Sequence, residues 1–308
     1  MRYGNGIMRI RYLMRRNMKH VIPAATFIAF MCGSCAMTRL YPLNEAFPEI
    51  STYYNPKGSI EELFYKTEAR PGYRRAIVYL PEGYRDNDVS YPVLYLLHGA
   101  NGNETSWITK GMILREIDKL IKRGEMEKAI VVFPNMNQYD NEKDFAKSRQ
   151  KNVPESFFEP DGSAERSLTD ILVPLIDSKY RTIPEKKMRA IAGLSMGGMQ
   201  AIHISASFPD MFGYVGMFSP FVTPFVKKGE YSDFYKNIRR KLKKQFEEPP
   251  EIYWIMIGKM DFFRPHTDGF SQYLKEKGYR HRYDVSKGGH EWYNWVEYCN
   301  RFMKEIFR

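Results

Sequence analysis

Runs of consecutive apolar residues recur along most of the chain and alternate with segments of helical periodicity. Runs such as "PVLYLLHG" and "AIVVFPN" predict strands that are buried on both faces of a parallel sheet. Eight strands are expected, at 60–66, 74–80, 93–97, 129–133, 188–194, 214–218, 252–257 and 281–286. Helices are expected between them, at 110–123, 164–179, 196–207, 268–277 and 291–306.

This alternation predicts an α/β fold with a mostly parallel eight-stranded sheet and helices on both faces. No helical pattern separates the first two strands, so we expect the sheet to begin with an antiparallel pair. Residues 220–250 are aromatic and basic and are expected to form a short cap near the strand ends. We assign one domain to residues 57–308, preceded by a linker at 36–56 that is rich in Pro, Asn and Tyr.

The first 35 residues have a different pattern. They carry six Lys or Arg residues and no acid, and an apolar run extends from Val21 to Met31 before small residues. This order of basic, apolar and small residues predicts a signal peptide over residues 1–35, with Met18 as a candidate true start. The apolar run is too short to be a permanent membrane-spanning helix.

The end of this segment points to a lipid anchor. Gly33, Ser34 and Cys35 resemble a bacterial lipoprotein box, in which the cysteine is acylated after cleavage. Cys32 departs from the box, because leucine is usual at that position, and an ordinary cleaved signal is the alternative. We expect an exported protein, either periplasmic or an outer-membrane lipoprotein that Cys35 anchors to the membrane.

Charge and cysteine content add little to this interpretation. The net charge is +11, but more than half of it lies in the first 35 residues, and the basic run 239–244 is typical of a solvated helix face. No nucleic-acid partner is therefore expected. The chain has three cysteines, and Cys299 is expected to be a buried small hydrophobe without a disulfide partner.

The segment "AGLSMGGMQA", residues 192–201, places Ser195 between two glycines, after an expected strand and before an expected helix. G-x-S-x-G in that position is the nucleophile elbow, a turn in which the serine takes strained backbone angles. Side chains at positions 193 and 197 would collide with neighbouring segments. The Ser195 hydroxyl is expected at the carboxyl edge of the sheet, where the helix N-terminus points at a developing oxyanion. An idle serine in a glycine-rich turn is the alternative.

A serine nucleophile needs a histidine base, and in this arrangement the base follows the serine in the chain. Six histidines are present: two precede Ser195, and His203 lies on the helix that follows it. Of the remaining three, His290 alone follows a glycine pair, Gly288 and Gly289, between the last expected strand and the last expected helix. Because glycines let that loop turn sharply toward the sheet edge, we predict that His290 is the base.

The remaining candidate residues follow from the same arrangement. Asp261, just beyond the strand 252–257, is the expected acid, and Asp268 is its nearest rival, although it reads as a helix start. The oxyanion hole is expected to use the backbone N–H groups of Met196 and Ala100. The side chains of Trp107 and Trp292 are candidates for lining an acyl pocket, and a buried structural tryptophan is the alternative for each.

Several segments together resemble the esterase D-like group of α/β-hydrolases. They are "VYLPEGY", "YPVLYLLHGANGNETSW", "LVPLIDSKYRT", "AGLSMGG", "GKMDFF" and "GGHEWYNW", and they extend from about residue 58 to residue 306. Within that group the chain is most similar to the feruloyl and acetylxylan esterases of carbohydrate esterase family one. The resemblance implies a serine carboxylesterase without metal or cofactor. It implies that Ser195, Asp261 and His290 form the triad and that Ala100 and Met196 are the oxyanion donors.

The substrate implied by this resemblance is a feruloyl or acetyl ester on a plant oligosaccharide or polysaccharide. A siderophore esterase or an acyltransferase with the same triad is the second hypothesis, since such relatives share the scaffold. S-formylglutathione hydrolases share it as well, but they are cytosolic, and the predicted export signal argues against that branch. A non-catalytic carbohydrate-binding protein is the third hypothesis, and the complete triad argues against it.

Overall fold

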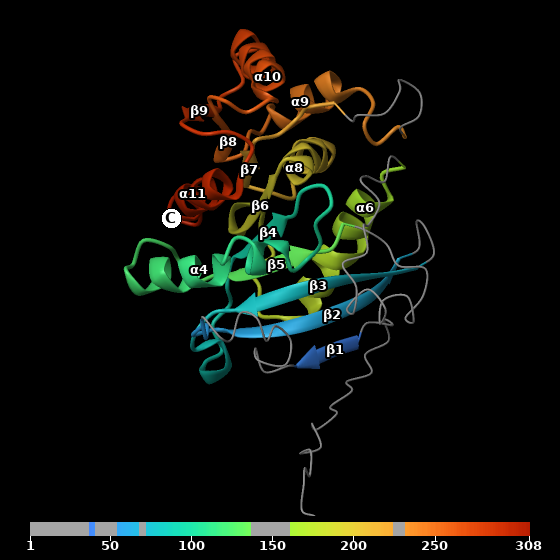
Figure 1. Cartoon of the computed structure of the whole chain (residues 1–308). Coiled ribbons are helices and arrows are strands. Elements are labelled where there is room, and N and C mark those ends of the chain that lie inside the picture. The colour runs from blue at the N-terminus through green and yellow to red at the C-terminus, as the bar shows by residue number, and fades with distance from the viewer. Residues whose placement is uncertain (1–36, 41–53, 68–71, 137–160, 224–231) are drawn as a thin grey trace, which may run out of the picture. The chain divides into compact units, whose positions relative to one another are not determined.

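The computed structural model describes residues 37–40, 54–67, 72–136, 161–223 and 232–308. One nine-stranded sheet organises this part of the chain (Figure 1). Its strands are β1 (Met37–Leu40), β2 (Ser59–Thr67), β3 (Gly72–Leu80), β4 (Val93–Leu97), β5 (Ile130–Pro134), β6 (Arg189–Leu194), β7 (Tyr214–Phe218), β8 (Ile252–Gly258) and β9 (Arg282–Ser286). The long apolar runs of the sequence are the central strands, and every residue of β4 to β8 is buried.

The strand order is β1-β2-β3-β5-β4-β6-β7-β8-β9. Strands β1, β2, β3 and β5 pair antiparallel, and all pairs from β5 to β9 are parallel. This is the sheet of an α/β-hydrolase fold. The carboxyl ends of the parallel strands share one edge, so residues that directly follow β4, β6, β8 and β9 are placed close together.

Helices cover both faces of the sheet because successive strand residues point to opposite sides. Ile191 of β6 belongs to one hydrophobic core, while its neighbours Ala190 and Ala192 belong to the other. The first core includes residues of α7 (Val173–Lys179), α8 (Met196–Ser207), α9 (Ile238–Gln245) and α10 (Arg264–Glu276). The second includes residues of α3 (Ser106–Thr109), α4 (Ile113–Lys122) and α11 (Trp292–Met303).

All eight predicted strands are present, and the antiparallel start is confirmed. The ninth strand, β1, lies within the segment expected to be a linker and pairs with β2, so that β1 forms one edge of the sheet. The helix expected over 110–123 begins later, at Ile113 of α4, because Met112 has a left-handed backbone (φ 49°) that separates α4 from the short helix α3. The helix expected over 164–179 comprises α6 (Ser163–Arg166), a π-helical turn (Ser167–Leu172) and α7.

Other expectations fall on smaller features. Helix α9 carries the basic run 239–244, within the predicted cap, and four of these six residues are exposed. Cys299 is fully buried and has no disulfide, as predicted. The signal peptide, Met18 and Cys35 lie outside the described residues. Within the described ranges, no helix is long and apolar enough to cross a membrane.

Candidate active site

Ser195 occupies the turn between β6 and α8 with a strained backbone, φ 53° and ψ −113°. The turn closes tightly against its neighbours. A Cβ atom on Gly193 would lie 2.5 Å from the carbonyl carbon of Gly197, and one on Gly197 would lie 2.5 Å from the carbonyl oxygen of His98. The two glycines are therefore required sterically, as the sequence predicts, and the strain at Ser195 is of the kind that collects at functional sites.

His290 and Asp261 are brought to this serine by two neighbouring loops. His290 Nε2 lies 3.0 Å from the Ser195 Oγ, and His290 Nδ1 lies 2.9 Å from Asp261 Oδ2. Gly288, with φ 84°, turns the loop after β9, and its carbonyl oxygen accepts a hydrogen bond of 2.9 Å from the Met260 N–H in the loop after β8. The structure thus brings together the serine, histidine and aspartate that the sequence selects.

The Asp261 carboxylate determines how protons are placed on His290. Burial raises the pKa of Asp261, but hydrogen bonds from His290 and from the Phe263 N–H outweigh burial and hold the pKa below its ordinary value. A carboxylate only accepts hydrogen bonds, so His290 carries its proton on Nδ1. Its Nε2 is then free to accept a hydrogen bond from the Ser195 hydroxyl, which is the arrangement that a general base requires.

Asp268, the rival acid, lies elsewhere. It lies inside α10 rather than at its start, since that helix begins at Arg264. Its carboxylate accepts a hydrogen bond from the Tyr283 hydroxyl and lies 3.5 Å from the Arg264 guanidinium. Asp268 is therefore an exposed side chain with partners of its own, and the carboxylate that pairs with His290 is Asp261.

A cavity of about 320 Å³ opens beside the Ser195 hydroxyl. The following residues line it: Gly99, Ala100, Gly102, Ser106, Lys110, Leu194, Ser195, Phe221, Phe262, Phe263, His290, Trp292 and Trp295. Ala100 follows β4 and faces the cavity, while Met196 begins helix α8. Among the described residues no protein acceptor binds the backbone N–H of Ala100 or Met196. Both N–H groups are therefore available to an oxyanion.

Aromatic rings surround His290. The ring centroids of Phe262, Phe263 and Trp295 lie 4.5, 5.1 and 4.9 Å from that of the imidazole. Sequence analysis missed these three residues, although each has a detectable signal: Phe262 and Phe263 directly follow the acid, and Trp295 is one helical turn after Trp292. The cavity can therefore receive a flat apolar group next to the serine.

The two tryptophans singled out from the sequence have different positions. Trp292 lines the cavity, as expected. Trp107 is only 1% exposed, and its Nε1 donates a hydrogen bond of 2.9 Å to the Leu97 carbonyl, so its expected place in the acyl pocket is wrong. Trp107 instead packs edge-on against Trp292 at 5.4 Å and supports the cavity wall from the core.

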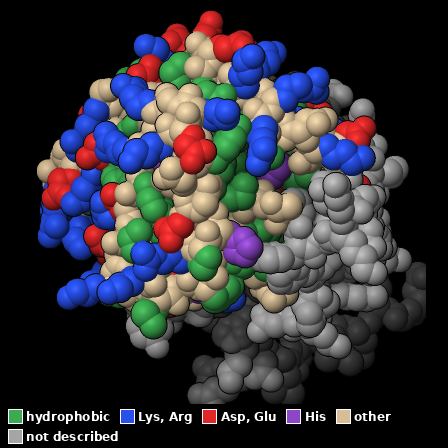
Figure 2. Space-filling model, turned by 90° about the horizontal axis from the view of Figure 1, so that it is seen from above, with side chains coloured by type: hydrophobic (Ala, Val, Ile, Leu, Met, Phe, Trp, Pro, Cys, Tyr) green, Lys and Arg blue, Asp and Glu red, His purple; other side chains and the backbone are tan. Residues whose placement is uncertain are grey.

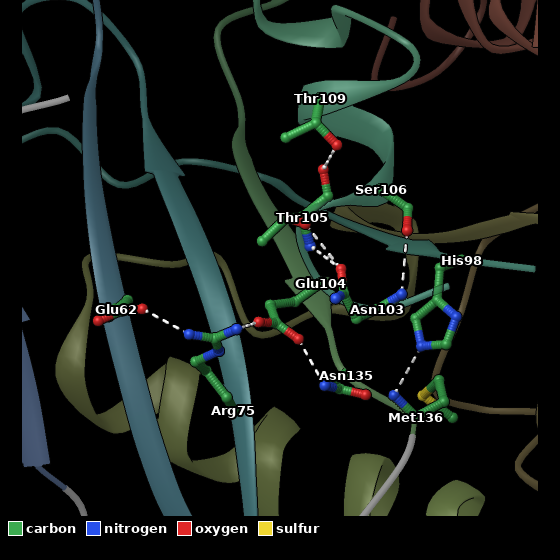
Figure 3. A network of polar contacts seen from close by, with 10 residues as sticks. All are labelled: Glu62, Arg75, His98, Asn103, Glu104, Thr105, Ser106, Thr109, Asn135 and Met136. Carbon is green, nitrogen blue, oxygen red and sulfur yellow. Dashed lines mark hydrogen bonds and ion pairs between the residues drawn. The ribbon is translucent and has the colours of Figure 1, made fainter. Parts of the chain in front are cut away.

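The loop that carries Ala100 is fixed by a chain of buried charges (Figure 3). Glu104, 1% exposed, forms an ion pair with Arg75 of β3 and accepts a hydrogen bond of 2.5 Å from Asn135 Nδ2, beyond β5. Arg75 also pairs with Glu62 of β2 at 2.8 Å. The Glu104 carboxylate is thereby held by side chains from β3 and from the end of β5, which are neighbouring strands. Glu104 itself does not line the cavity.

His98 provides a second tie to the same loop (Figure 3). Burial lowers the pKa of His98 to about 4, so the ring is neutral. Its Nε2 accepts a hydrogen bond of 3.0 Å from the Met136 N–H, and its Nδ1 lies 2.8 Å from the Gly99 carbonyl oxygen, to which it donates. His98 therefore holds the peptide next to Ala100 against the end of β5.

We predict that Glu104→Gln lowers kcat by about tenfold and leaves KM unchanged. Loss of the charge weakens the ion pair with Arg75, so the loop holds the Ala100 N–H less firmly in place. This N–H acts only when negative charge develops on the substrate, and full removal of one such donor lowers kcat by about 100- to 1000-fold. Glu62→Gln is the matched control, because Glu62 pairs with the same arginine but does not touch the loop. Steady-state kinetics and melting temperatures of both variants test this prediction. Equal kcat values in the two variants would show that Glu104 serves stability alone.

Metal ligands are not gathered at this site. Across the described residues, no group of three His, Cys, Asp or Glu side chains could hold a metal ion. The arrangement supplies a nucleophile, a base oriented by a carboxylate, and two N–H donors. Those are the groups needed for acyl transfer through a covalent intermediate.

Comparisons with known proteins agree with this chemistry. The family model Esterase, described as "Putative esterase", matches residues 68–302. The endo-1,4-beta-xylanase/feruloyl esterase of Xylanibacter ruminicola is 32% identical over 258 residues, covering 82% of this chain and 32% of the relative. The chain therefore spans about a third of that relative's length.

Solved structures of similar fold include two ferulic acid esterases. One is 25% identical with a TM-score of 0.65, and the match covers 80% of this chain and 97% of the other. The second, a CE1 ferulic acid esterase from Anaeromyces mucronatus, is 23% identical with a TM-score of 0.64, covering 83% of this chain and 92% of the other.

Proposed function

Because the chain belongs to the Esterase family, we propose that it is a carboxylic ester hydrolase that cleaves feruloyl or acetyl esters on plant polysaccharides. The observation that carries the proposal is the hydrogen-bonded series from Ser195 through His290 to Asp261 at 3.0 and 2.9 Å. It lies beside a cavity with aromatic walls. Pockets of about 300–1,000 Å³ suit small ligands, so this one is large enough for an aromatic acyl group.

In the proposed reaction the Ser195 Oγ attacks the ester carbonyl carbon while His290 Nε2 takes the hydroxyl proton. Asp261 accepts a hydrogen bond from Nδ1–H and stabilises the imidazolium. The N–H groups of Ala100 and Met196 donate to the oxyanion. His290 then protonates the leaving alcohol, an acyl-enzyme forms, and water activated by His290 releases the acid and restores Ser195.

A preference for feruloyl esters is supported by the aromatic rings around the cavity and by the similarity of the chain to feruloyl and ferulic acid esterases. Phe262, Trp292 and Trp295 offer faces and edges to a planar phenylpropenoyl group. An acetyl group would leave most of the cavity unfilled. We therefore expect feruloyl esters to be hydrolysed with a higher kcat/KM than acetyl esters.

The experiment is a comparison of purified protein on methyl ferulate, p-nitrophenyl acetate, acetylated xylan and enterobactin. Our proposal predicts the highest kcat/KM on methyl ferulate. A preference for enterobactin would indicate a siderophore esterase instead. Formation of sugar esters when a sugar alcohol is added would indicate an acyltransferase.

We also propose that the protein is exported and that Cys35 carries a lipid anchor. The supporting pattern is the basic and apolar N-terminal segment followed by Gly33, Ser34 and Cys35. Expressed in bacteria with labelled palmitate, the protein should take up label and partition into detergent. A Cys35→Ser variant should not be labelled. Equal labelling of the two proteins would contradict the anchor.

A further inference from the structure

A second cavity, of about 450 Å³, lies between helices α9 and α10. We call it the α9–α10 groove, and its lining residues are Phe221, Val222, Thr223, Ile238, Arg239, Leu242, His266, Gly269, Phe270 and Tyr273. Phe221 lines the active-site cavity as well. Its ring packs on Phe263 at 5.2 Å, and Phe263 packs on His290 at 5.1 Å. The groove therefore begins where the active-site cavity ends.

The wall shared by the two cavities is held by buried hydrogen bonds. Burial lowers the pKa of His203 to about 4, and its neutral ring donates from Nε2 to the Val222 carbonyl at 3.0 Å. The Thr267 hydroxyl of α10, fully buried, donates to the Pro220 carbonyl at 2.9 Å. His203, which sequence analysis leaves without a role, is thus a support for this wall. A preformed wall reduces the entropy lost when a ligand binds.

The groove combines an apolar floor with a polar rim. Leu242 and Phe270 are buried at its base, whereas Arg239 and His266 are exposed at its edge. Tyr273 is partly exposed, and the Arg239 guanidinium lies 5.3 Å from the centroid of its ring. An aromatic face beside hydrogen-bond donors suits a sugar ring, which has an apolar face and a hydroxylated edge.

Charge around the groove favours an anion. Helix α9 has the sequence "IRRKLKKQ", with five bases and no acid. Arg239, Arg240, Lys243 and Lys244 are exposed, and none of them forms an ion pair with another described residue. Figure 2, seen from above the α9 and α10 end of Figure 1, shows Lys and Arg side chains gathered around an apolar strip. Such a surface attracts carboxylates over roughly a Debye length, about 8–10 Å.

We propose that the α9–α10 groove binds the alcohol side of the ester substrate, and that this alcohol is an oligosaccharide bearing uronic acid carboxylates. This inference rests on the proposed esterase function. With the acyl group beside Ser195, the sugar extends past Phe221 into the groove. Its ring stacks on Tyr273 and a carboxylate meets Arg239.

The experiment compares three feruloyl esters: methyl ferulate, a neutral feruloylated oligosaccharide and one that carries a uronic acid. For the wild type, KM should be lowest for the acidic ester and should rise with added salt. Tyr273→Ala should raise KM for both oligosaccharide esters by about tenfold, and Arg239→Gln should raise KM for the acidic ester alone. Methyl ferulate kinetics should be unchanged in both variants, because this ester does not reach the groove.

Arg282→Gln is the matched control, because Arg282 of β9 does not line the groove. Its guanidinium lies over the Trp254 ring instead, 5.0 Å from the ring centroid. It should leave all three KM values unchanged. Identical KM values for acidic and neutral esters in the wild type, or no effect of either groove variant, would overturn the inference. Failure to hydrolyse any of the three esters would instead overturn the proposed function. If the two groove variants bind vesicles of anionic phospholipid less well than the wild type, while their KM values for the oligosaccharide esters are unchanged, the groove is a membrane contact and our proposal is rejected.

Discussion

Ser195→Ala is expected to lower kcat/KM for methyl ferulate by about five to six orders of magnitude while the protein remains folded. Without the hydroxyl there is no covalent intermediate, and only the oxyanion donors and substrate binding remain to accelerate the reaction. The fold should persist, because the α8 hydrogen bond from the Met199 N–H to the Ser195 carbonyl oxygen, 3.1 Å long, involves backbone atoms only.

Ser205→Ala is the control for this substitution. Ser205 is buried on the same helix, and among the described residues its hydroxyl bonds only to the Ile202 carbonyl within that helix, at 3.3 Å. Both variants should have melting temperatures close to the wild type, and only Ser195→Ala should be inactive. A Ser195→Ala protein that keeps a tenth of wild-type activity would exclude Ser195 as the nucleophile.

Asp261→Asn is expected to lower kcat near neutral pH by about three to four orders of magnitude, with a far smaller effect on KM. The amide keeps the shape of the carboxylate but can donate to His290 Nδ1. That donation favours the tautomer with its proton on Nε2, which cannot take the proton of Ser195. The pKa of Asp261 lies below its ordinary value, so the wild-type carboxylate is charged near neutral pH.

Asp268→Asn provides the comparison, because Asp268 is exposed and bonds to Tyr283 and Arg264 at the surface. It should change stability by about 1 kcal/mol or less and leave kcat unchanged. Values of kcat measured for both variants decide the assignment. Inactivity of Asp268→Asn beside an active Asp261→Asn would mean that the acid is misassigned.

The sheet and its site were predictable because their signals are local. Strands β4 to β8 are runs of apolar residues that are buried along their whole length. Ser195 and His290 sit in short glycine-containing turns after strands. Parallel strands then bring these turns to one edge, and Asp261 could be chosen over Asp268 because it lies just beyond the strand 252–257.

Features that depend on distant partners were not predictable. The helical pattern at 110–123 continues through Gly111, but Gly111 packs so closely on Trp292 of α11 that a Cβ there would lie 3.1 Å from the Trp292 ring, and the chain turns at Met112. Trp107 was misplaced because nothing local shows that its indole N–H bonds to Leu97. The ion pair from Glu104 to Arg75 joins segments whose proximity only the completed sheet establishes. Local periodicity carries no information of that kind.

The central claim is that hydrolysis proceeds through an ester of Ser195. Its most direct test is rapid acid quenching of the wild type during turnover of excess methyl ferulate, followed by intact-mass analysis and peptide mapping. Our account predicts one feruloyl group per chain, carried by the peptide that contains Ser195 and absent from the Ser195→Ala protein. A feruloyl group on any other residue, or turnover with no acylated protein at any quench time, would contradict it.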